Sequence, residues 1–477
     1  MIRRYNSAVR TPDDASEELP AAAEPSQRSA RGRITRLVRA PFGDVPGPLP
    51  AHRPDTSLEE RATPDQERGM RAFWWDGFWA NSAETVIINY TGLYLLALGG
   101  GNAEVGLLAA LSSLSAALAF FPGARAAERF GRRKAIVLAT GGGIARVAML
   151  MLAFVPFFTG GNPAVWTVVA LVSFRGFWGY FAIPAWTSLT ADIVPLGIRG
   201  RFLASRNFGM GVSALATLPI AGYLIDRFGG LHGWQVVWLL AFVVGALSTW
   251  AYAAIPEPPP HPRVAELQRE PDRPGVLADV LADPNFVAYL LSVAVWNIAL
   301  TAAGPFFNVY LSAHFHASTA MIGFINAVIS ATGLAGVVYF GRMMDRRGTK
   351  WVLVVSGLLI PLLPAAWLLV TAPWQVIFIN LFGGVVWAGY TLGLINMVMV
   401  MAPPGKRARY AAAFQTVTFA SAFAGPLLGG YMIDTVGFKA VFAFSAVGRL
   451  ASTLILMRFV RQEPSGRPAA VEAEGAT

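Results

Sequence analysis

Two ionisable side chains, Glu84 and Arg175, lie in the middle of long apolar stretches of the sequence. A charged group at the centre of a bilayer costs about 2.5–3.5 kcal/mol or more, so each one needs a partner or a function. A carboxylate that is removed from water tends to keep its proton, whereas a nearby guanidinium favours ionisation. Three roles are therefore open for Glu84: reversible proton binding, a structural ion pair, or direct contact with a substrate.

Other acids are scarce in the apolar part of the chain. Between residues 286 and 460 the only acids are Asp345 and Asp434, and both lie at the ends of apolar stretches. Asp76 lies closer than Glu84 to the start of the first apolar stretch. Glu84 is therefore the one carboxylate that we expect at mid-membrane.

The residue types needed for several other chemistries are missing or scattered. The chain has no cysteine, which excludes thiol catalysis and disulfides. His314 and His316 lie two residues apart in a short polar break and do not make a metal-ligand cluster. A phosphate-binding loop such as Gly-x-x-x-x-Gly-Lys-Ser/Thr does not occur, so ATP-driven pumping is not expected. We expect no enzyme activity, no metal site and no cofactor.

The composition is that of a protein with many membrane spans. Of 477 residues, 55% are hydrophobic and only 14% are charged, compared with about 25% charged residues in soluble domains. The net charge of +10 does not indicate a nucleic-acid partner. Residues 1–70 carry eleven arginines and eleven acids, so the excess lies among the apolar stretches, where membrane proteins keep cytoplasmic Lys and Arg. A lipid bilayer is the expected surrounding.

The apolar stretches predict an all-α membrane protein with twelve transmembrane helices, because a spanning helix needs about 20 apolar residues. The predicted helices cover 72–98, 104–122, 134–157, 164–190, 202–225, 233–255, 286–312, 320–341, 350–370, 375–402, 410–433 and 438–460. The predicted organisation is a disordered tail over 1–70, a six-helix bundle over 71–255, a connector over 256–285, a second bundle over 286–460 and a tail over 461–477.

The charges in the breaks between these helices predict the orientation. The breaks after the second, fourth, sixth, eighth and tenth helices hold clusters of Arg and Lys, whereas the other breaks hold one or none. Because positive charges resist translocation, the even-numbered breaks and both termini are expected on the cytoplasmic side.

Internal repeats relate the two halves. Gly222-Tyr223-Leu224-Ile225-Asp226 recurs 208 residues later as Gly430-Tyr431-Met432-Ile433-Asp434. An acid followed three residues later by glycine also ends the middle helix of every predicted three-helix unit. Its four copies are Glu128…Gly131, Asp226…Gly229, Asp345…Gly348 and Asp434…Gly437. Four copies at equivalent places indicate three-helix repeats within two related six-helix bundles.

The segment from Ala124 to Lys134 resembles the signature between helices 2 and 3 of the major facilitator superfamily, with Ala124 in place of glycine and Glu128 in place of aspartate. The resemblance covers about 72–460 and includes a second copy at 341–350. It implies a cytoplasmic gate in which a tight glycine turn joins two helices and charged groups cross-link helix ends. The predicted gate residues are Glu128, Arg129, Gly131, Arg132, Asp345, Arg346 and Gly348.

The same resemblance places helices 1, 4, 7 and 10 around a central cavity, with Glu84 and Arg175 on facing walls. The cavity candidates on these helices are Glu84, Arg175, Trp178, Asn297, Asn308, Trp387 and Asn396. Gly425, Pro426, Gly429 and Gly430 resemble an antiporter motif of the family, displaced here from the fifth helix to the eleventh. Small residues also allow close helix packing, so we interpret these four as a packing motif.

These features predict a secondary transporter of the inner membrane that works as a monomer by alternating access. The favoured function is proton-coupled export of a small amphipathic or cationic compound. The alternative is a sugar or metabolite permease, in which the asparagines supply hydrogen bonds. A non-transporting membrane receptor with this fold is the less favoured alternative.

Overall fold

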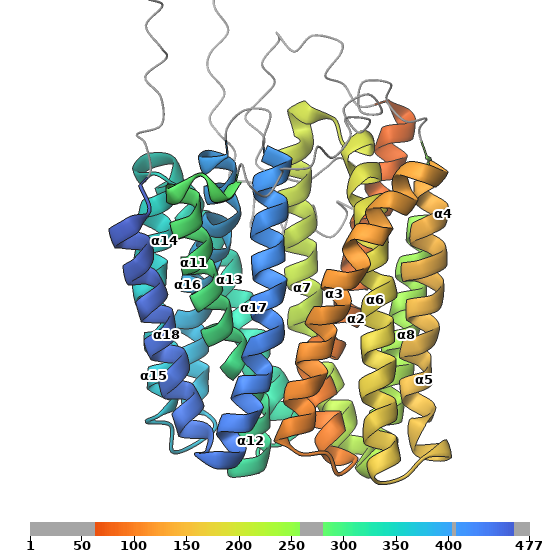
Figure 1. Ribbon diagram of the computed structural model, residues 1–477. Coiled ribbons are helices and arrows are strands. Elements are labelled where there is room, and N and C mark those ends of the chain that lie inside the picture. Colours follow the sequence, from red (N-terminus) through yellow and green to blue (C-terminus); the bar gives the residue numbers. More distant parts are fainter. Residues whose placement is uncertain (1–62, 258–279, 403–406, 462–477) are drawn as a thin grey trace, which may run out of the picture. The chain divides into compact units, whose positions relative to one another are not determined.

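The computed structural model describes residues 63–257, 280–402 and 407–461, and these residues form helices and no strands (Figure 1). The first half contains α2 (Pro64–Ala97), α3 (Asn102–Phe130), α4 (Arg133–Val137), the π-helix η2 (Leu138–Ile144), α5 (Ala145–Phe158), α6 (Asn162–Ile193), α7 (Leu196–Phe228) and α8 (Gly230–Ala253). The second half contains α11 (Pro284–Ala303), α12 (Phe306–Phe315), α13 (Thr319–Arg347), α14 (Thr349–Leu359), α15 (Leu362–Trp367), α16 (Gln375–Met401), α17 (Arg407–Thr435) and α18 (Phe438–Phe459).

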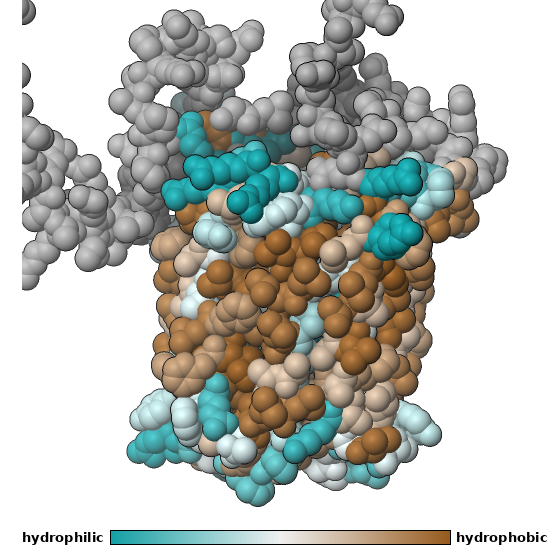
Figure 2. Space-filling model, turned by 90° about the vertical axis from the view of Figure 1, so that its left-hand side faces the viewer, coloured by the Kyte–Doolittle hydropathy of each residue, from teal (hydrophilic) through white to brown (hydrophobic). Residues whose placement is uncertain are grey.

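Eleven segments of the described chain are long and apolar enough to cross a membrane. The remaining long helix, α2, has 34 residues and is less apolar because it carries Asp76 and Glu84 within its length. Figure 2 shows a broad hydrophobic band between two hydrophilic rims on the face in view. The prediction of an all-α membrane protein is confirmed.

Three of the predicted spans are interrupted rather than continuous. The seventh breaks between α11 and α12 at Pro305, and the ninth breaks between α14 and α15 at Pro361. Proline has no N–H for the helix and its ring clashes with the carbonyl four residues earlier. In the third span the run Gly141–Gly143 lies in η2, where the hydrogen bonding is locally π-helical.

The predicted start of the first bundle at residue 71 is too late. Helix α2 begins at Pro64, where Thr63 and Gln66 form a reciprocal capping box. The Thr63 backbone N–H donates to Oε1 of Gln66 at 2.9 Å, and the Gln66 N–H donates to Oγ1 of Thr63 at 3.3 Å. These bonds and a proline at the first helical position stabilise a helix start within the predicted tail. The rest of that tail, most of the connector and residues 462–477 lie outside the described part.

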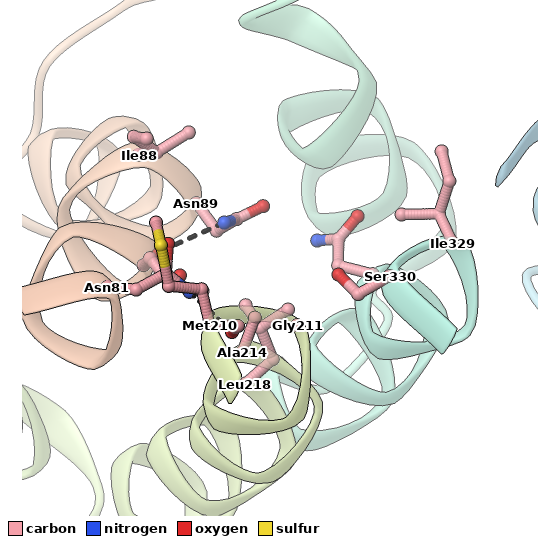
Figure 3. A pocket seen from close by; sticks show the side chains of 11 residues that line it. Asn81, Ile88, Asn89, Met210, Gly211, Ala214, Leu218, Ile329 and Ser330 are labelled. Carbon is pink, nitrogen blue, oxygen red and sulfur yellow. Dashed lines mark hydrogen bonds between the residues drawn. The ribbon is translucent and has the colours of Figure 1, made fainter. Parts of the chain in front are cut away.

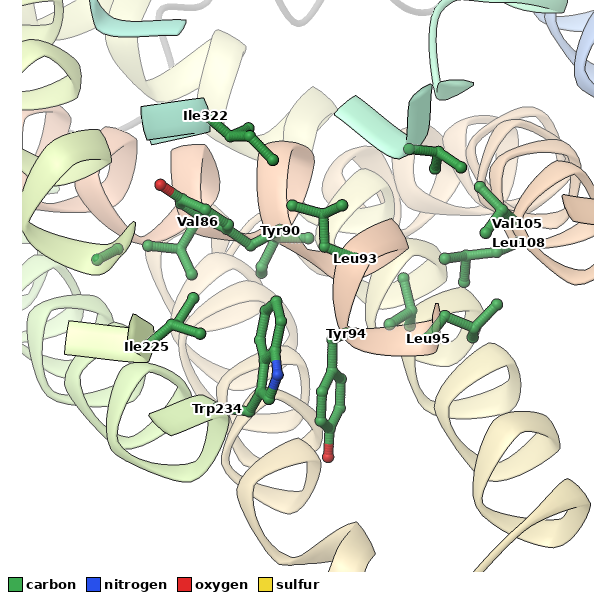
Figure 4. Packing of buried hydrophobic residues seen from close by; sticks show 14 of the residues in the cluster. Val86, Tyr90, Leu93, Tyr94, Leu95, Val105, Leu108, Ile225, Trp234 and Ile322 are labelled. Carbon is green, nitrogen blue, oxygen red and sulfur yellow. The ribbon is translucent and has the colours of Figure 1, made fainter. Parts of the chain in front are cut away.

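The two halves meet along two helix pairs. Helix α7 packs against α13, and α3 packs against α17, as Figure 1 also shows for the latter pair. A buried apolar cluster joins the halves near the end of α2, where Val86 and Tyr90 lie close to Ile322 of α13 (Figure 4). Burial of such side chains leaves little room for movement at this end of the contact.

Candidate functional site

Glu84 and Arg175 form an ion pair between α2 and α6. Nη2 of Arg175 donates to Oε2 of Glu84. The Glu84 side chain is 44% exposed, whereas that of Arg175 is 13% exposed. The carboxylate is therefore the more exposed member of the pair.

A second carboxylate–guanidinium pair lies in the same half and is more buried; the sequence analysis named its acid but not its partner. Asp76 and Arg206 are both buried, with Oδ2 and Nη2 3.6 Å apart. Ser248 donates to Oδ1 of Asp76 at 2.8 Å, and Nε of Arg206 donates to the Phe73 carbonyl at 3.2 Å. Asp76 thus has partners on two other helices, as a buried carboxylate requires. An acid inside an apolar run was the signal that marked it.

Arg146 of α5 lies within electrostatic range of Asp76 and Glu84. Its Nε is buried and has no hydrogen-bond partner among the described residues. The first half therefore gathers two carboxylates and three guanidinium groups around α2. The second half also buries a guanidinium, that of Arg449 in α18, but both carboxylate–guanidinium pairs described here lie in the first.

The predicted tryptophans lie in aromatic clusters. Trp178 packs among Phe174, Phe177 and Phe181 of its own helix, α6. Trp387 of α16 packs against Trp296 and Tyr390, and the guanidinium of Arg449 lies 5.7 Å from its ring centroid. The structure does not bring these two residues together with Glu84 through any contact that it describes.

The three predicted asparagines have different surroundings. Asn297 is buried and donates to the Val293 carbonyl of its own helix. Asn396 is exposed and donates to the carbonyl of Leu392, also one turn earlier. Asn308 of α12 instead reaches across the halves and donates to the Asn89 carbonyl at 3.1 Å.

A cavity of about 360 Å³ lies between α2, α7 and α13 (Figure 3). Its polar lining consists of Asn81, Thr85, Asn89, Asn326 and Ser330, and its apolar lining includes Ile88, Met210, Ala214, Leu218 and Ile329. The resemblance had pointed to helices 1, 4, 7 and 10, whereas these walls come from the first, fifth and eighth spans. Thr85 directly follows Glu84 in α2, but Glu84 itself is not among the lining residues.

The halves are joined at the end of the molecule that carries the odd-numbered breaks. Asp226, at the end of α7, accepts hydrogen bonds from the backbone N–H groups of Thr319 at 3.0 Å and Ala320 at 2.7 Å, and from the Thr319 hydroxyl. Nδ2 of Asn102 donates to Oδ1 of Asp434 at 3.2 Å. Both contacts cross between the halves and close the space between them at this end.

The predicted gate residues lie at the opposite ends of α3 and α13. Gly131 and Gly348 have positive φ, 63° and 84°, and turn the chain between helices. The side chains of Arg129, Arg132, Asp345 and Arg346 are exposed, while that of Glu128 lies outside the described residues.

Arg133, one residue beyond the predicted set, is the buried cation of this motif. It donates to Asp192 and to Ser188 of α6, the latter at 3.1 Å, and its Nε lies 4.0 Å from Oε1 of Glu257. Two of these partners lie in α6 of the first half, and Glu257 lies in the segment that follows α8. In this conformation the motif thus ties α4 to the rest of its own bundle.

The motif of Gly425, Pro426, Gly429 and Gly430 lies where α17 contacts two neighbours. A β-carbon on Gly429 would collide with the carbonyl oxygen of Ala302 in α11. On the other side of α17, a β-carbon on Gly106 of α3 would lie 2.6 Å from the Pro426 carbonyl oxygen. The motif thus lies in close backbone contacts both within the second half and between the halves.

Comparison with known proteins agrees with this architecture. The sequence model of the Major Facilitator Superfamily matches residues 77–309 and 286–477. The chain is 24% identical over 403 residues to "Multidrug resistance protein MdtG" of Dickeya zeae (strain Ech586), covering 82% of this chain and 93% of that protein.

Solved structures share the fold at low sequence identity. A D-xylose-proton symporter matches with a TM-score of 0.65 and 15% identity, covering 83% of this chain and 98% of the other. A variant of the nucleoside transporter NupG matches with a TM-score of 0.66 and 12% identity, covering 83% and 100%. With its paired helical halves and its match to the family model over nearly the whole membrane region, the chain belongs to the Major Facilitator Superfamily of membrane transporters.

Proposed function

We propose that this chain exports a small molecule in exchange for protons, by alternating access around the cavity between α2, α7 and α13. The observation that carries the proposal is the Glu84–Arg175 pair, in which a part-exposed carboxylate of α2, a helix that also lines the cavity, has a more buried guanidinium as its partner. The name of the relative from Dickeya zeae, a multidrug resistance protein, supports the direction of transport.

Competition between a proton and Arg175 for Glu84 provides the coupling step. When Glu84 is ionised, the pair ties α2 to α6 across the bundle. When Glu84 binds a proton, the charge-assisted hydrogen bond is lost and the guanidinium is left without its counter-ion. The ion pair can form again only after the proton leaves Glu84. Proton release is therefore linked to the contact between α2 and α6.

The joined end of the molecule supports the alternating-access part of the proposal. With the basic breaks on the cytoplasmic side, the contacts of Asp226 and Asp434 close the external side of the space between the halves. We assign the structure to the inward-facing state of a monomer in the inner membrane, with both termini in the cytoplasm. The exposed gate residues at the other end are those expected to form the latch in the outward-facing state.

The test is transport by purified protein in proteoliposomes with and without an imposed pH gradient. Three compounds are compared: ethidium, xylose and a lipophilic amine. The variants are Glu84→Gln and the control Asp65→Asn, which changes an exposed acid at the start of α2. We expect gradient-dependent movement in the wild type and the control, and none of that dependence in Glu84→Gln. Gradient dependence retained by Glu84→Gln would remove Glu84 from coupling. Movement of xylose without gradient dependence would favour the permease.

A further inference from the structure

The asparagines of the cavity form hydrogen bonds to the protein through their amide nitrogens. Nδ2 of Asn81 donates to the Met210 carbonyl at 2.7 Å, and Nδ2 of Asn89 donates to the Thr85 carbonyl at 2.9 Å. A backbone carbonyl can only accept hydrogen bonds, so each amide must present its NH₂ group to the protein. Each therefore leaves its carbonyl oxygen for a ligand, and Asn89 also keeps its second N–H.

A relay of amides fixes the orientation of the third asparagine. Asn308 donates to the backbone carbonyl of Asn89, and Asn326 donates to Oδ1 of Asn308 at 3.0 Å. Because the relay starts at a carbonyl, its direction cannot be reversed. Asn326 therefore also uses its NH₂ group on the protein and leaves its oxygen for the cavity.

The cavity thus presents three amide oxygens, from Asn81, Asn89 and Asn326. Asn81 uses both of its N–H groups on the protein, and Asn89 and Asn326 each use one. The Asn89 oxygen points away from α2 towards α13 in Figure 3. Two hydroxyls, of Thr85 and Ser330, complete the polar lining. The acceptor sites of these oxygens outnumber the N–H and O–H donors that remain. A ligand with several N–H donors is therefore better matched to this lining than a carboxylate, which can only accept hydrogen bonds.

We infer that the cavity binds the protonated primary amine of an amphipathic compound, with the side-chain oxygens of Asn81, Asn89 and Asn326 as its acceptors. An alkylammonium group has three N–H donors and no acceptor, which matches a lining of three free oxygens. The apolar wall, which includes Ile88, Met210 and Leu218, packs the hydrocarbon part of the compound. Glu84, next to Thr85, is the nearest carboxylate in the sequence of α2. The inference rests on the proposed function in taking this cavity as the transport site.

A series of ligands that differ in one group tests the inference on the wild-type protein. Binding of 4-phenylbutylamine, its trimethylammonium analogue, 4-phenylbutanol and 4-phenylbutyrate is measured by calorimetry on the full chain in nanodiscs without a gradient. The trimethylammonium compound keeps the charge and loses every N–H donor. We expect the amine to bind at least about tenfold more tightly than each of the others. Equal affinity for the amine and the trimethylammonium analogue would overturn the role of the oxygens, as would preferred binding of the carboxylate.

Two matched variants locate the site. Asn89→Leu removes one acceptor, and Asn396→Leu removes an asparagine that also bonds the carbonyl four residues earlier but lies outside the cavity. We expect amine affinity to fall about tenfold in Asn89→Leu and to stay unchanged in Asn396→Leu. Equal effects in the two variants would contradict the assignment. If Asn89→Leu does not fold, the wild-type ligand series still decides.

Failure of this inference and failure of the proposed function give different results. If the amine binds no better than its analogues while the wild type exports other compounds with a pH gradient, the ligand class is wrong and the proton-coupled function stands. If the amine binds with the expected order but no compound moves in response to a gradient, the binding site stands and proton coupling is wrong.

Discussion

Asp226 and Asp434, 208 residues apart, occupy equivalent places in the two halves. Each lies near the end of a helix and contacts the start of a helix in the other half, Asp226 on α13 and Asp434 on α3. An anion is favoured at a helix N-terminus because the first N–H groups there have no partner within the helix. The repeated acid thus acts twice in closing the same end of the transporter.

Asp226→Asn is expected to favour opening of this end. Loss of an N-terminal capping interaction costs about 1–2 kcal/mol, which changes a two-state ratio by roughly 5- to 30-fold. The chain has no cysteine, so spin labels on cysteines at Gly101 and Thr435 report the distance between the halves. We expect a longer-distance population in Asp226→Asn and a smaller change in Asp434→Asn, which has a single bond to lose. An unchanged distribution would contradict a closing role for Asp226.

The buried Asp76–Arg206 pair is expected to stabilise the first half. Removing one partner of a buried pair leaves an uncompensated charge and costs about 3–5 kcal/mol. Asp76→Asn should therefore lower the unfolding temperature, and the double variant Asp76→Asn with Arg206→Met should regain part of the lost unfolding temperature. Unfolding is followed by tryptophan fluorescence. The control is Asp65→Asn, which breaks an ion pair to Arg68 whose side chains are 75% and 71% exposed. Similar shifts in Asp76→Asn and the control would show that the buried pair contributes nothing particular.

Close packing of α17 against α11 predicts a steric effect at Gly429. Gly429→Ala places a β-carbon against the Ala302 carbonyl, and overpacking of this kind costs about 1–3 kcal/mol. Gly179→Ala is the matched control, because a β-carbon there meets nothing within 4 Å and alanine favours the helix by about 1 kcal/mol. We expect Gly429→Ala to lower the unfolding temperature and Gly179→Ala to raise it. A neutral Gly429→Ala would mean that α17 shifts freely.

The orientation in the membrane is tested by labelling from one side. Gly101 and Arg346 lie exposed at opposite ends of the molecule. A membrane-impermeant maleimide should label Gly101→Cys in intact cells, and should label Arg346→Cys only after the cells are lysed. Labelling of both from outside would overturn the assigned topology.

Local sequence properties were enough to predict where the membrane spans lie and where the glycine turns between them fall. Apolar length locates a membrane helix wherever it packs, so the predicted stretch 233–255 and the observed α8, Gly230–Ala253, nearly coincide. The glycine that ends each acid-x-x-Gly repeat has positive φ in the structure, from Gly131 at 63° to Gly437 at 101°, because this turn needs a residue without a β-carbon. The helix breaks at Pro305 and Pro361 were readable from the same local chemistry and were missed.

The cavity depended on tertiary structure because an asparagine in a helix has two ways to satisfy its amide. Asn297 and Asn396 bond the carbonyl four residues earlier, whereas Asn308 reaches a residue 219 positions away. The residue type and its spacing are the same in both cases, so the sequence could not tell a packing asparagine from one that orients a cavity. Only the approach of α2, α7 and α13 decided which amide oxygens are left for a ligand, since a hydrogen bond needs its partner within about 3 Å.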